Sequence, residues 1–207
     1  FISFANCGLP YYIGGEIKEK SELTLQTPES FRARFNVDVR NFTEVISINK
    51  SEKTVTAINL KTGRQYRESY DKLILSMGAE PIKPPIKGID SDRVFTLRNI
   101  PDTLRIKNHI DKKSPNSAVV VGGGYIGVEM AENLKLAGLD VTIVELADHL
   151  IGPLDIEMAS EVHRYIRRKG VELVLSNSVK EIEEVGDKLI VKLNDGSIET
   201  DMVVMAV

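Results

Sequence analysis

A glycine-rich turn that follows an apolar run constrains the fold of this 207-residue chain more than any other feature. Residues 119–121 are all valine and lead into Gly122-Gly123-Gly124-Tyr125-Ile126-Gly127, a G-x-G-x-x-G pattern. In such a pattern the first glycine allows a sharp turn, the second lets a pyrophosphate approach the backbone, and the third lets the helix pack against the strand. The N–H groups at the helix start then favour phosphate. The pattern predicts a dinucleotide site, and a purely structural turn is the alternative.

An acidic residue follows the next predicted strand. Residues 140–144 form a second largely apolar run, and Glu145 comes directly after it. A carboxylate in this place can accept hydrogen bonds from the adenosine ribose and repels the additional phosphate of NADP. Residues 146–149 include no Arg or Lys that could bind that phosphate. We therefore expect NADH to be preferred over NADPH, and a surface glutamate at a strand end is the alternative.

The second half of the chain alternates strands with helices. Apolar spacing and Gly, Pro and Asn stops predict helices at 101–111, 125–137 and 155–169, strands at 117–121, 140–145, 171–175 and 202–207, and a β-hairpin of 179–185 with 188–193. Strands that alternate with helices indicate a parallel sheet. The predicted fold class is α/β, with a Rossmann-like NAD(P)-binding domain of parallel sheet and β-hairpin or meander over residues 99–207.

The first half of the chain does not show this regular alternation of strands and helices. Thr27-Pro28-Glu29 is typical of a helix start and predicts a helix at 28–35. Alternating residues predict strands at 43–50 and 53–60, and an apolar run predicts a buried strand within 70–79, before a Pro-rich linker at 81–85. No glycine-rich turn between a strand and a helix occurs here. Residues 1–98 are therefore expected to be an incomplete domain, and the chain is expected to be an internal fragment of a longer protein.

Composition narrows the functional class. The net charge of −3 gives no general attraction to nucleic acid or anionic membranes, so neither is expected as a partner. No apolar run approaches the roughly 20 residues that span a bilayer. One cysteine cannot form an internal disulfide, which favours a reducing, cytoplasmic location. The three histidines lack metal-ligand spacing, and no metal site is expected.

The single cysteine lies in Ser3-Phe4-Ala5-Asn6-Cys7-Gly8-Leu9-Pro10. Asn6 is expected to cap a helix that begins at Cys7, and Pro10 is tolerated in a first turn. A thiol at a helix start gains thiolate character and can attack a disulfide or polysulfide sulfur. A small buried core cysteine is the alternative interpretation.

Three segments together resemble a known family. Residues 4–13, with Ala5-Asn6-Cys7-Gly8-Leu9-Pro10, are similar to the redox motif of the single-cysteine branch of the flavoprotein pyridine nucleotide-disulfide oxidoreductases. The similarity is greatest to coenzyme A disulfide reductases and coenzyme A-dependent NADH sulfur (persulfide, polysulfide) reductases. Residues 75–81 resemble the turn that leaves the family's FAD domain, and residues 201–207 resemble the strand that closes its NAD domain. The resemblance implies a partial FAD-binding domain in residues 1–98.

The resemblance also implies a chemistry. In the family, NADH passes hydride to FAD, and the cysteine sulfur is then reduced. Dithiol members carry a second cysteine where this chain has Tyr12, so Cys7 is expected to act alone, held as a mixed disulfide with coenzyme A or as a sulfenate.

The other site residues follow from the same resemblance, whereas the turn glycines and Glu145 follow from the glycine-rich pattern itself. Cys7 is the expected catalytic residue. Contacts to coenzyme A are expected from Ser3, Asn6 and Arg34. Contacts to NAD are expected from Gly122, Gly123, Gly124, Tyr125, Ile126, Gly127, Glu129 and Glu145. Contacts to FAD are expected from Val45, Ser76, Gly78 and Arg98. A solvated helix charge is the alternative for Arg34, and core packing is the alternative for Tyr125.

The expected function is therefore that of an FAD-dependent oxidoreductase that uses NADH to reduce coenzyme A disulfide, persulfide or polysulfide through Cys7. The full-length parent is expected to be a homodimer with a small-molecule thiol or disulfide partner. The 207 residues alone are expected to bind FAD poorly and to be inactive, because the family's first FAD fingerprint is absent. An NADH oxidase or peroxidase with a cysteine sulfenate, and a non-catalytic NAD-binding module, are the alternatives.

Overall fold

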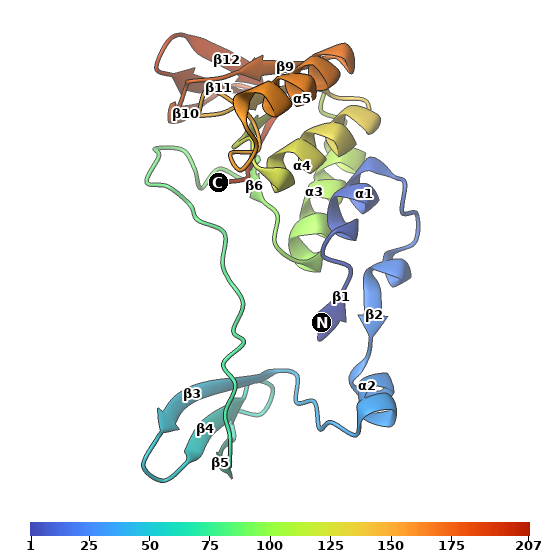
Figure 1. The fold of residues 1–207 in the computed structure, drawn as a ribbon, viewed down its shortest axis with the longest axis vertical. Coiled ribbons are helices and arrows are strands. Elements are labelled where there is room, and N and C mark those ends of the chain that lie inside the picture. Colours follow the sequence, from blue (N-terminus) through green and yellow to red (C-terminus); the bar gives the residue numbers. More distant parts are fainter. The chain divides into compact units, whose positions relative to one another are not determined.

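The computed structural model describes all 207 residues and divides into two compact units (Figure 1). The larger unit comprises Ala5–Leu23 and Glu80–Val207, and the smaller comprises Phe1–Phe4 and Thr24–Ala79. The larger unit contains nearly all of the buried apolar side chains, whereas Ala57 is the buried apolar residue of the smaller one. The larger unit therefore holds the hydrophobic core.

A five-stranded parallel sheet forms the centre of the larger unit. Its strand order is β6-β13-β7-β8-β9, and its strands are β6 (Val94–Thr96), β13 (Met202–Met205), β7 (Ser117–Val121), β8 (Asp140–Val144) and β9 (Val171–Val174). The near-continuous apolar strands β7, β8 and β13 are buried on both faces, as parallel strands usually are. The predicted α/β, Rossmann-like fold class is confirmed. The sequence did not predict β6, which has only three residues.

Three longer helices connect the strands of this sheet. They are α3 (Ile100–Lys113), α4 (Tyr125–Leu136) and α5 (Ile156–Arg168), each within two residues of its predicted bounds. Helix α3 begins after Asn99, whose side chain accepts a hydrogen bond from the Asp102 N–H while the Asp102 carboxylate accepts one from the Asn99 N–H. This reciprocal pair satisfies two N–H groups that a helix start otherwise leaves unpaired.

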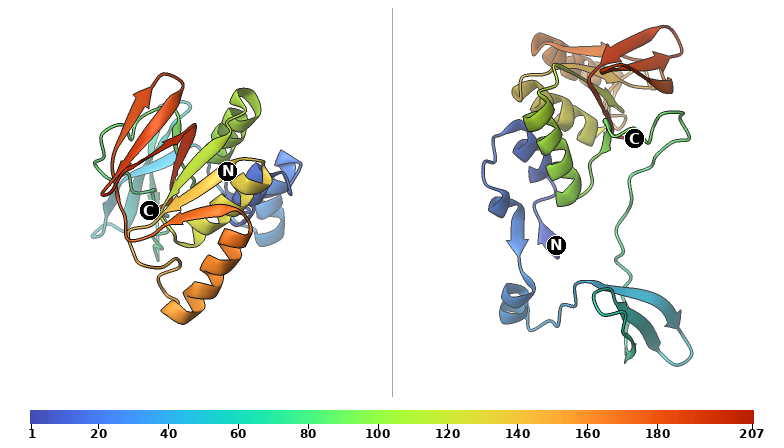
Figure 2. Two further views of the ribbon diagram at one scale, coloured as in Figure 1. Left: turned by 90° about the horizontal axis from the view of Figure 1, so that it is seen from above. Right: turned by 180° about the vertical axis from the view of Figure 1, so that it is seen from behind.

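An antiparallel meander packs on the sheet (Figures 1 and 2). The predicted hairpin is present as β10 (Val179–Val185) and β11 (Lys188–Leu193), and β12 (Ser197–Thr200) adds a third strand that was not predicted. Its inward side chains, such as Ile182, Leu189 and Val191, are almost fully buried against Val119 and Val203 of the sheet. The meander therefore covers one face of the sheet.

A short helix, α1 (Gly8–Gly14), packs against α3 and α4, and η1 (Lys20–Leu23) follows it. Leu9 and Ile13 are buried in this contact. The expected cap was wrong, because the helix begins at Gly8 and Cys7 is its N-cap without a side-chain capping bond. The Asn6 side chain instead accepts a hydrogen bond from Arg98 Nη1 at 3.4 Å, so its oxygen is engaged across the unit.

The smaller unit is built from local elements. It contains β1 (Ser3–Phe4), β2 (Thr24–Gln26), α2 (Pro28–Phe35), β3 (Thr43–Asn49), β4 (Thr54–Asn59) and β5 (Gln65–Ser69). The predicted helix start at Thr27 is confirmed, since its hydroxyl accepts from the Ser30 N–H at 3.2 Å. Strands β3, β4 and β5 form an antiparallel meander, of which β5 was not predicted.

The buried strand predicted within residues 70–79 is wrong. The segment forms neither helix nor strand, and Ile74 and Met77 are 86% and 83% exposed. A strand requires a hydrogen-bonded neighbour, and no strand of this chain pairs with the segment. Its apolar composition is that of a buried strand, but none of the strands lies beside it in a sheet, and the Tyr70 N–H at its start donates to the Lys53 carbonyl at 2.9 Å.

Candidate functional site

The glycine turn between β7 and α4 has the geometry that its sequence predicts. Gly122 has φ of +106°, and a β-carbon on Gly127 would lie 1.9 Å from the Gly122 carbonyl oxygen, so neither position accepts a side chain. Gly124 is the N-cap of α4 without a side-chain capping bond, and the space where its β-carbon would point is open. Uncapped helix N–H groups beside open space suit a pyrophosphate, and the turn therefore fits a dinucleotide.

The Glu145 carboxylate lies against this turn. Oε2 accepts a hydrogen bond from the Gly123 N–H at 2.5 Å, and Oε1 accepts one from the Ala147 N–H at 2.7 Å. A β-carbon on Gly123 would lie 3.1 Å from Oε2, so the missing side chain allows this approach. The two backbone donors fix the carboxylate beside the turn, and its contact with a ribose stays a prediction.

The loop between β8 and α5 is also anchored to the turn. The Ile151 N–H donates to the Gly123 carbonyl at 2.8 Å, and the Leu150 N–H donates to Nε2 of His163 on α5 at 3.0 Å. His163 and Leu150 are both buried, and a β-carbon on Gly123 would collide with Leu150. Because Nε2 accepts this bond, His163 is neutral with its proton on Nδ1. Sequence reasoning missed this contact, since a lone histidine gives no indication of a partner 13 residues away.

We expect the larger unit to lose stability in mild acid through His163. Burial, followed by the charge of Arg167, lowers the pKa of His163, while His149 and Asp148 also face it. A lowered histidine pKa gives stability that is complete above the unfolded value of about 6.5 and is lost as pH falls below it. Thermal melts of wild type and His163→Gln between pH 7.5 and 5 should show the smaller acid loss in the variant.

The wild-type comparison needs this variant because another histidine acts in the opposite direction. The Asp148 carboxylate raises the pKa of His149. Protonation of His149 therefore stabilises the folded protein as pH falls through the same range. Equal pH slopes for wild type and His163→Gln would contradict the assignment.

Cys7 lies in a pocket that contains several of the predicted site residues. The pocket has a volume of about 320 Å³, and its lining includes Asn6, Cys7, Leu9, Pro10, Leu97, Arg98, Tyr125, Ile126 and Glu129. The cysteine is exposed and carries a free thiol, so the alternative of a buried core cysteine is wrong. The structure thus brings the expected redox sulfur to the first turn of α4, directly after the glycine turn.

The N-terminus of α3 positions the polar wall of this pocket. The Arg98 N–H donates to Oδ2 of Asp102 at 3.0 Å, which fixes the backbone just before the helix. The Arg98 guanidinium in turn donates to Oδ1 of Asn6, next to the cysteine. Arg98 was expected to contact FAD, and in this structure it lines the pocket of the sulfur.

Glu129 supplies a carboxyl group that can carry a proton. Burial raises its pKa, and the nearby Glu132 carboxylate raises it further. Glu129 follows Tyr125 by one helical turn, so the two side chains share one face of α4. The pocket therefore combines a thiol, a guanidinium and a carboxyl group with a raised pKa, a set suited to sulfur chemistry with proton transfer.

The remaining predicted residues lie in the smaller unit. Ser3 is on β1, and Arg34 is exposed on α2 with its guanidinium 5.1 Å from the Phe35 ring centre. Val45 is 53% exposed on β3, and Ser76 and Gly78 are in the irregular segment before Glu80. Their contacts with coenzyme A and FAD stay predictions.

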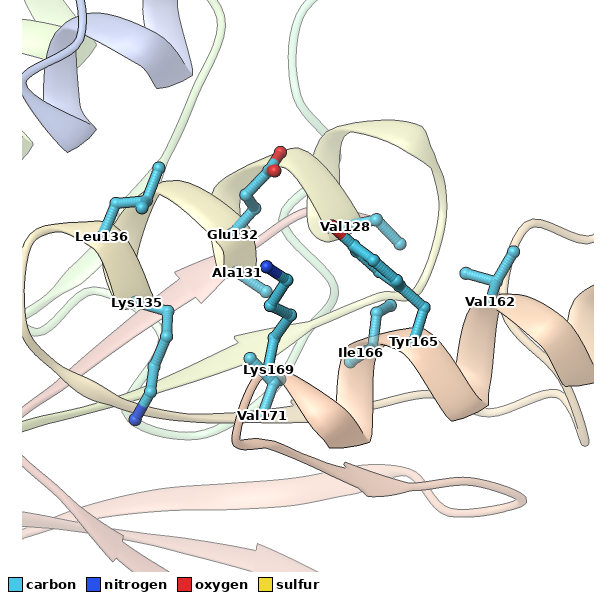
Figure 3. Close-up of a pocket in the computed structure, with 10 residues that line it drawn as sticks. All are labelled: Val128, Ala131, Glu132, Lys135, Leu136, Val162, Tyr165, Ile166, Lys169 and Val171. Carbon is cyan, nitrogen blue, oxygen red and sulfur yellow. The ribbon is translucent and has the colours of Figure 1, made fainter.

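A second hollow lies apart from these residues. It has a volume of about 330 Å³ and lies between α4 and α5, where the Tyr165 side chain extends from α5 toward Val128 of α4 (Figure 3). Its wall is mostly apolar, with Lys169 over the Tyr165 ring at 5.3 Å. It includes neither Cys7 nor any residue of the glycine turn, so the pocket at Cys7 is the better candidate for redox chemistry.

Comparison with known proteins agrees with this geometry. The model of the pyridine nucleotide-disulphide oxidoreductase family matches residues 2–207. The chain belongs to this family. No helix of the chain has the length and apolarity needed to cross a membrane.

Three relatives in the family show which members the chain resembles. It is 37% identical to a protein named NADH oxidase from Methanocaldococcus jannaschii, over 99% of this chain and 46% of the relative. It is 38% identical to a coenzyme A disulfide reductase from Staphylococcus haemolyticus, over 88% of this chain and 41% of the relative. The crystal structure of the reduced CoADR-RHD protein of Bacillus anthracis superimposes with a TM-score of 0.95 and 52% identity, over 100% of this chain and 37% of that one. The chain therefore spans less than half the length of these relatives.

Proposed function

We propose that this chain is part of an FAD-dependent oxidoreductase that uses NADH to reduce coenzyme A disulfide, persulfide or polysulfide through Cys7. The proposal rests on one pocket, which is lined both by Cys7, the only cysteine of the chain, and by the first turn of α4. Helix α4 begins directly after the glycine turn. A nicotinamide nucleotide bound at that turn and a sulfur substrate bound at Cys7 would both contact α4. The similarity to a coenzyme A disulfide reductase supports the sulfur substrate.

At the nucleotide end, the first turn of α4 would bind the pyrophosphate with its uncapped N–H groups. Tyr125 begins the helix and is 62% exposed, so its ring can move as a nicotinamide enters the pocket. Glu145 is fixed beside the turn and would accept hydrogen bonds from the ribose. NADH supplies the electron pair for the reaction.

At the sulfur end, the Cys7 thiolate would attack a disulfide RSSR, forming a bond between Cys7 Sγ and one sulfur and releasing RS⁻. The released thiolate takes one proton. Two electrons and a second proton then convert the mixed disulfide to the Cys7 thiolate and a second RSH. Glu129, whose pKa is raised, would hold a proton in the pocket for a leaving thiolate. Arg98 and Asn6 would orient the anionic group next to the sulfur.

The flavin expected of the family would accept hydride and return an electron pair to sulfur when bound. We propose that residues 1–98 contribute to its domain and residues 99–207 form the NAD domain. We further propose that the full-length protein binds FAD, whereas these 207 residues alone do not retain it. The full-length protein is also expected to be a homodimer.

A substrate comparison on the full-length protein tests the proposal. NADH consumption is followed in parallel with coenzyme A disulfide, inorganic polysulfide, hydrogen peroxide and oxygen. We expect faster turnover with a sulfur substrate than with peroxide or oxygen at equal concentration. Turnover with peroxide or oxygen alone would reject the sulfur substrate and favour the NADH oxidase function, which the M. jannaschii relative supports by name. No released flavin after denaturation, together with no turnover, would favour a non-catalytic NAD-binding module.

The carboxylate of Glu145 should set the preference for NADH. We expect the full-length protein to bind NADH at least about tenfold more tightly than NADPH, because the 2′-phosphate would approach a fixed negative charge. In Glu145→Gln the ratio should narrow, since the amide loses the charge and keeps one oxygen to accept one of the two backbone N–H bonds that hold the carboxylate. Titration of wild type and Glu145→Gln with both nucleotides gives the ratio of NADH to NADPH affinity for each protein. The same ratio in both proteins would show that Glu145 does not determine the preference for NADH.

A further inference from the structure

Asn133 on α4 is an unusual residue in the larger unit. It is fully buried, and while its amide nitrogen donates to the Glu129 carbonyl at 2.8 Å, its Oδ1 has no hydrogen-bond donor. Native structures leave few buried polar atoms unpaired, because the loss of water is not compensated. A buried side-chain oxygen of this kind therefore requires a structural explanation.

The explanation lies on the facing helix. A β-carbon built on Gly14, the last residue of α1, would lie 2.4 Å from Asn133 Oδ1, well inside normal contact. The Gly14 Cα–H that occupies this direction therefore points at the oxygen, a weak contact found where helices approach closely. Only glycine at position 14 permits this approach. The pair thus fixes the spacing between α1 and α4.

The two helices carry opposite sides of the candidate site. Tyr125, Glu129 and Asn133 follow one another at intervals of four residues and lie along one stripe of α4. The first two line the pocket with Cys7, which precedes α1, and the third contacts Gly14 at the end of α1. Helix α1 therefore runs along this stripe from the pocket to Asn133, and a change at Gly14 is transmitted to the position of Cys7.

We propose that Gly14 and Asn133 are a pair of positioning residues that hold the Cys7 thiol at its working distance from Tyr125 and Glu129. The effect on turnover rests on the proposed function, whereas the effect on the placement of the thiol does not. Neither residue lines the pocket, and both act through the separation of the two helices.

The test is a set of three variants of the full-length protein: Gly14→Ala, Asn133→Ala and the two together. Gly14→Ala should lower kcat for sulfur reduction about tenfold, because a new methyl group forces the helices about 1 Å apart. The KM for NADH should stay within about twofold, because the glycine turn is untouched. In the double variant the added methyl group no longer meets the Asn133 oxygen and lies 3.1 Å from the β-carbon of residue 133, a tight contact that a small shift relieves, so kcat should return to within about threefold of Asn133→Ala.

A second measurement requires no turnover. The rate of Cys7 alkylation by iodoacetamide should rise about threefold in Gly14→Ala, as the pocket wall moves away from the thiol, and should return in the double variant. Gly152→Ala is the matched control, since its β-carbon meets nothing within 4 Å, and it should change neither rate.

The proposal would be overturned if Gly14→Ala had the kcat and the alkylation rate of wild type. It would also be overturned if adding Asn133→Ala did not relieve the loss of kcat, or if the KM for NADH rose in proportion to that loss. If the wild-type protein reduces no sulfur substrate, the proposed function fails. The alkylation rates of the four proteins then still decide whether the pair positions Cys7.

Discussion

Replacing Cys7 by serine in the full-length protein should reduce NADH-dependent sulfur reduction by about 10³-fold or more, because Cys7 is the one cysteine in the pocket that could form the mixed disulfide. A serine hydroxyl is close in size but cannot be oxidised and reduced in this way. Cys7 is exposed and makes no packing contribution comparable to that of its buried neighbours Leu9 and Ile13, so the fold should be retained. Initial rates of NADH oxidation with polysulfide and with coenzyme A disulfide measure the effect.

Two controls make this result specific to the sulfur. Binding of NADH by Cys7→Ser should stay within about twofold of wild type, since the glycine turn is unchanged. Peptide mass spectrometry should show a reductant-reversible mass increment on the peptide that contains Cys7 in wild type and none on the same peptide of the variant. Undiminished sulfur reduction by Cys7→Ser would contradict the role of Cys7, whatever the true substrate is.

Two alanine substitutions in the glycine turn should have different effects, because only one of the added methyl groups would collide with the protein. In Gly127→Ala the β-carbon would lie 1.9 Å from the Gly122 carbonyl, so the contact between β7 and α4 must open. We expect a loss of about 2–3 kcal/mol in the free energy of unfolding and a loss of NADH binding. In Gly124→Ala the β-carbon meets nothing within 4 Å and φ is −73°, so the fold should tolerate the methyl group.

Gly124→Ala should nevertheless weaken NADH binding about tenfold, because the methyl group occupies the space where the pyrophosphate approaches the backbone. Its free energy of unfolding should change by less than about 1 kcal/mol. Thermal or urea unfolding gives the stability of each variant, and titration with NADH gives the affinity. Unchanged NADH affinity in Gly124→Ala would place the pyrophosphate elsewhere, and wild-type stability in Gly127→Ala would contradict the close contact at the turn.

Elements governed by local chemistry were predictable from the sequence. The glycine turn, the helix after Thr27 and the long helices α3, α4 and α5 depend on capping residues, glycines and apolar spacing that lie within one segment. The expected place of Glu145 beside the turn follows from the same short βαβ unit. These features need no knowledge of distant residues.

Features that depend on distant partners were not predictable. The short strands β5, β6 and β12 form because neighbouring strands complete their hydrogen bonds, and the segment at 70–79 lacks such neighbours despite its composition. Asn6 was expected to cap its own helix, but Arg98 engages its oxygen from 92 residues away. The contact between Gly14 and Asn133 likewise has no local sequence pattern.

The pocket itself was partly predictable. The family resemblance selected Asn6, Cys7, Tyr125, Glu129 and Arg98, and all five line it. Its apolar wall of Leu9, Pro10, Leu97 and Ile126 includes only one residue that was expected in a site. The resemblance identifies polar side chains through their roles in relatives, whereas the apolar wall depends on how α1, α3 and α4 pack.

The uncovered run Leu73-Ile74-Leu75-Ser76-Met77 has a practical consequence for handling the protein. An unpaired segment of high β-propensity, without charge or proline, is a template for intermolecular cross-β pairing. A preparation in which no other segment covers these five residues should aggregate, and aggregation should become faster as the protein concentration rises. A lysine in place of Ile74 would act as a gatekeeper against such self-association.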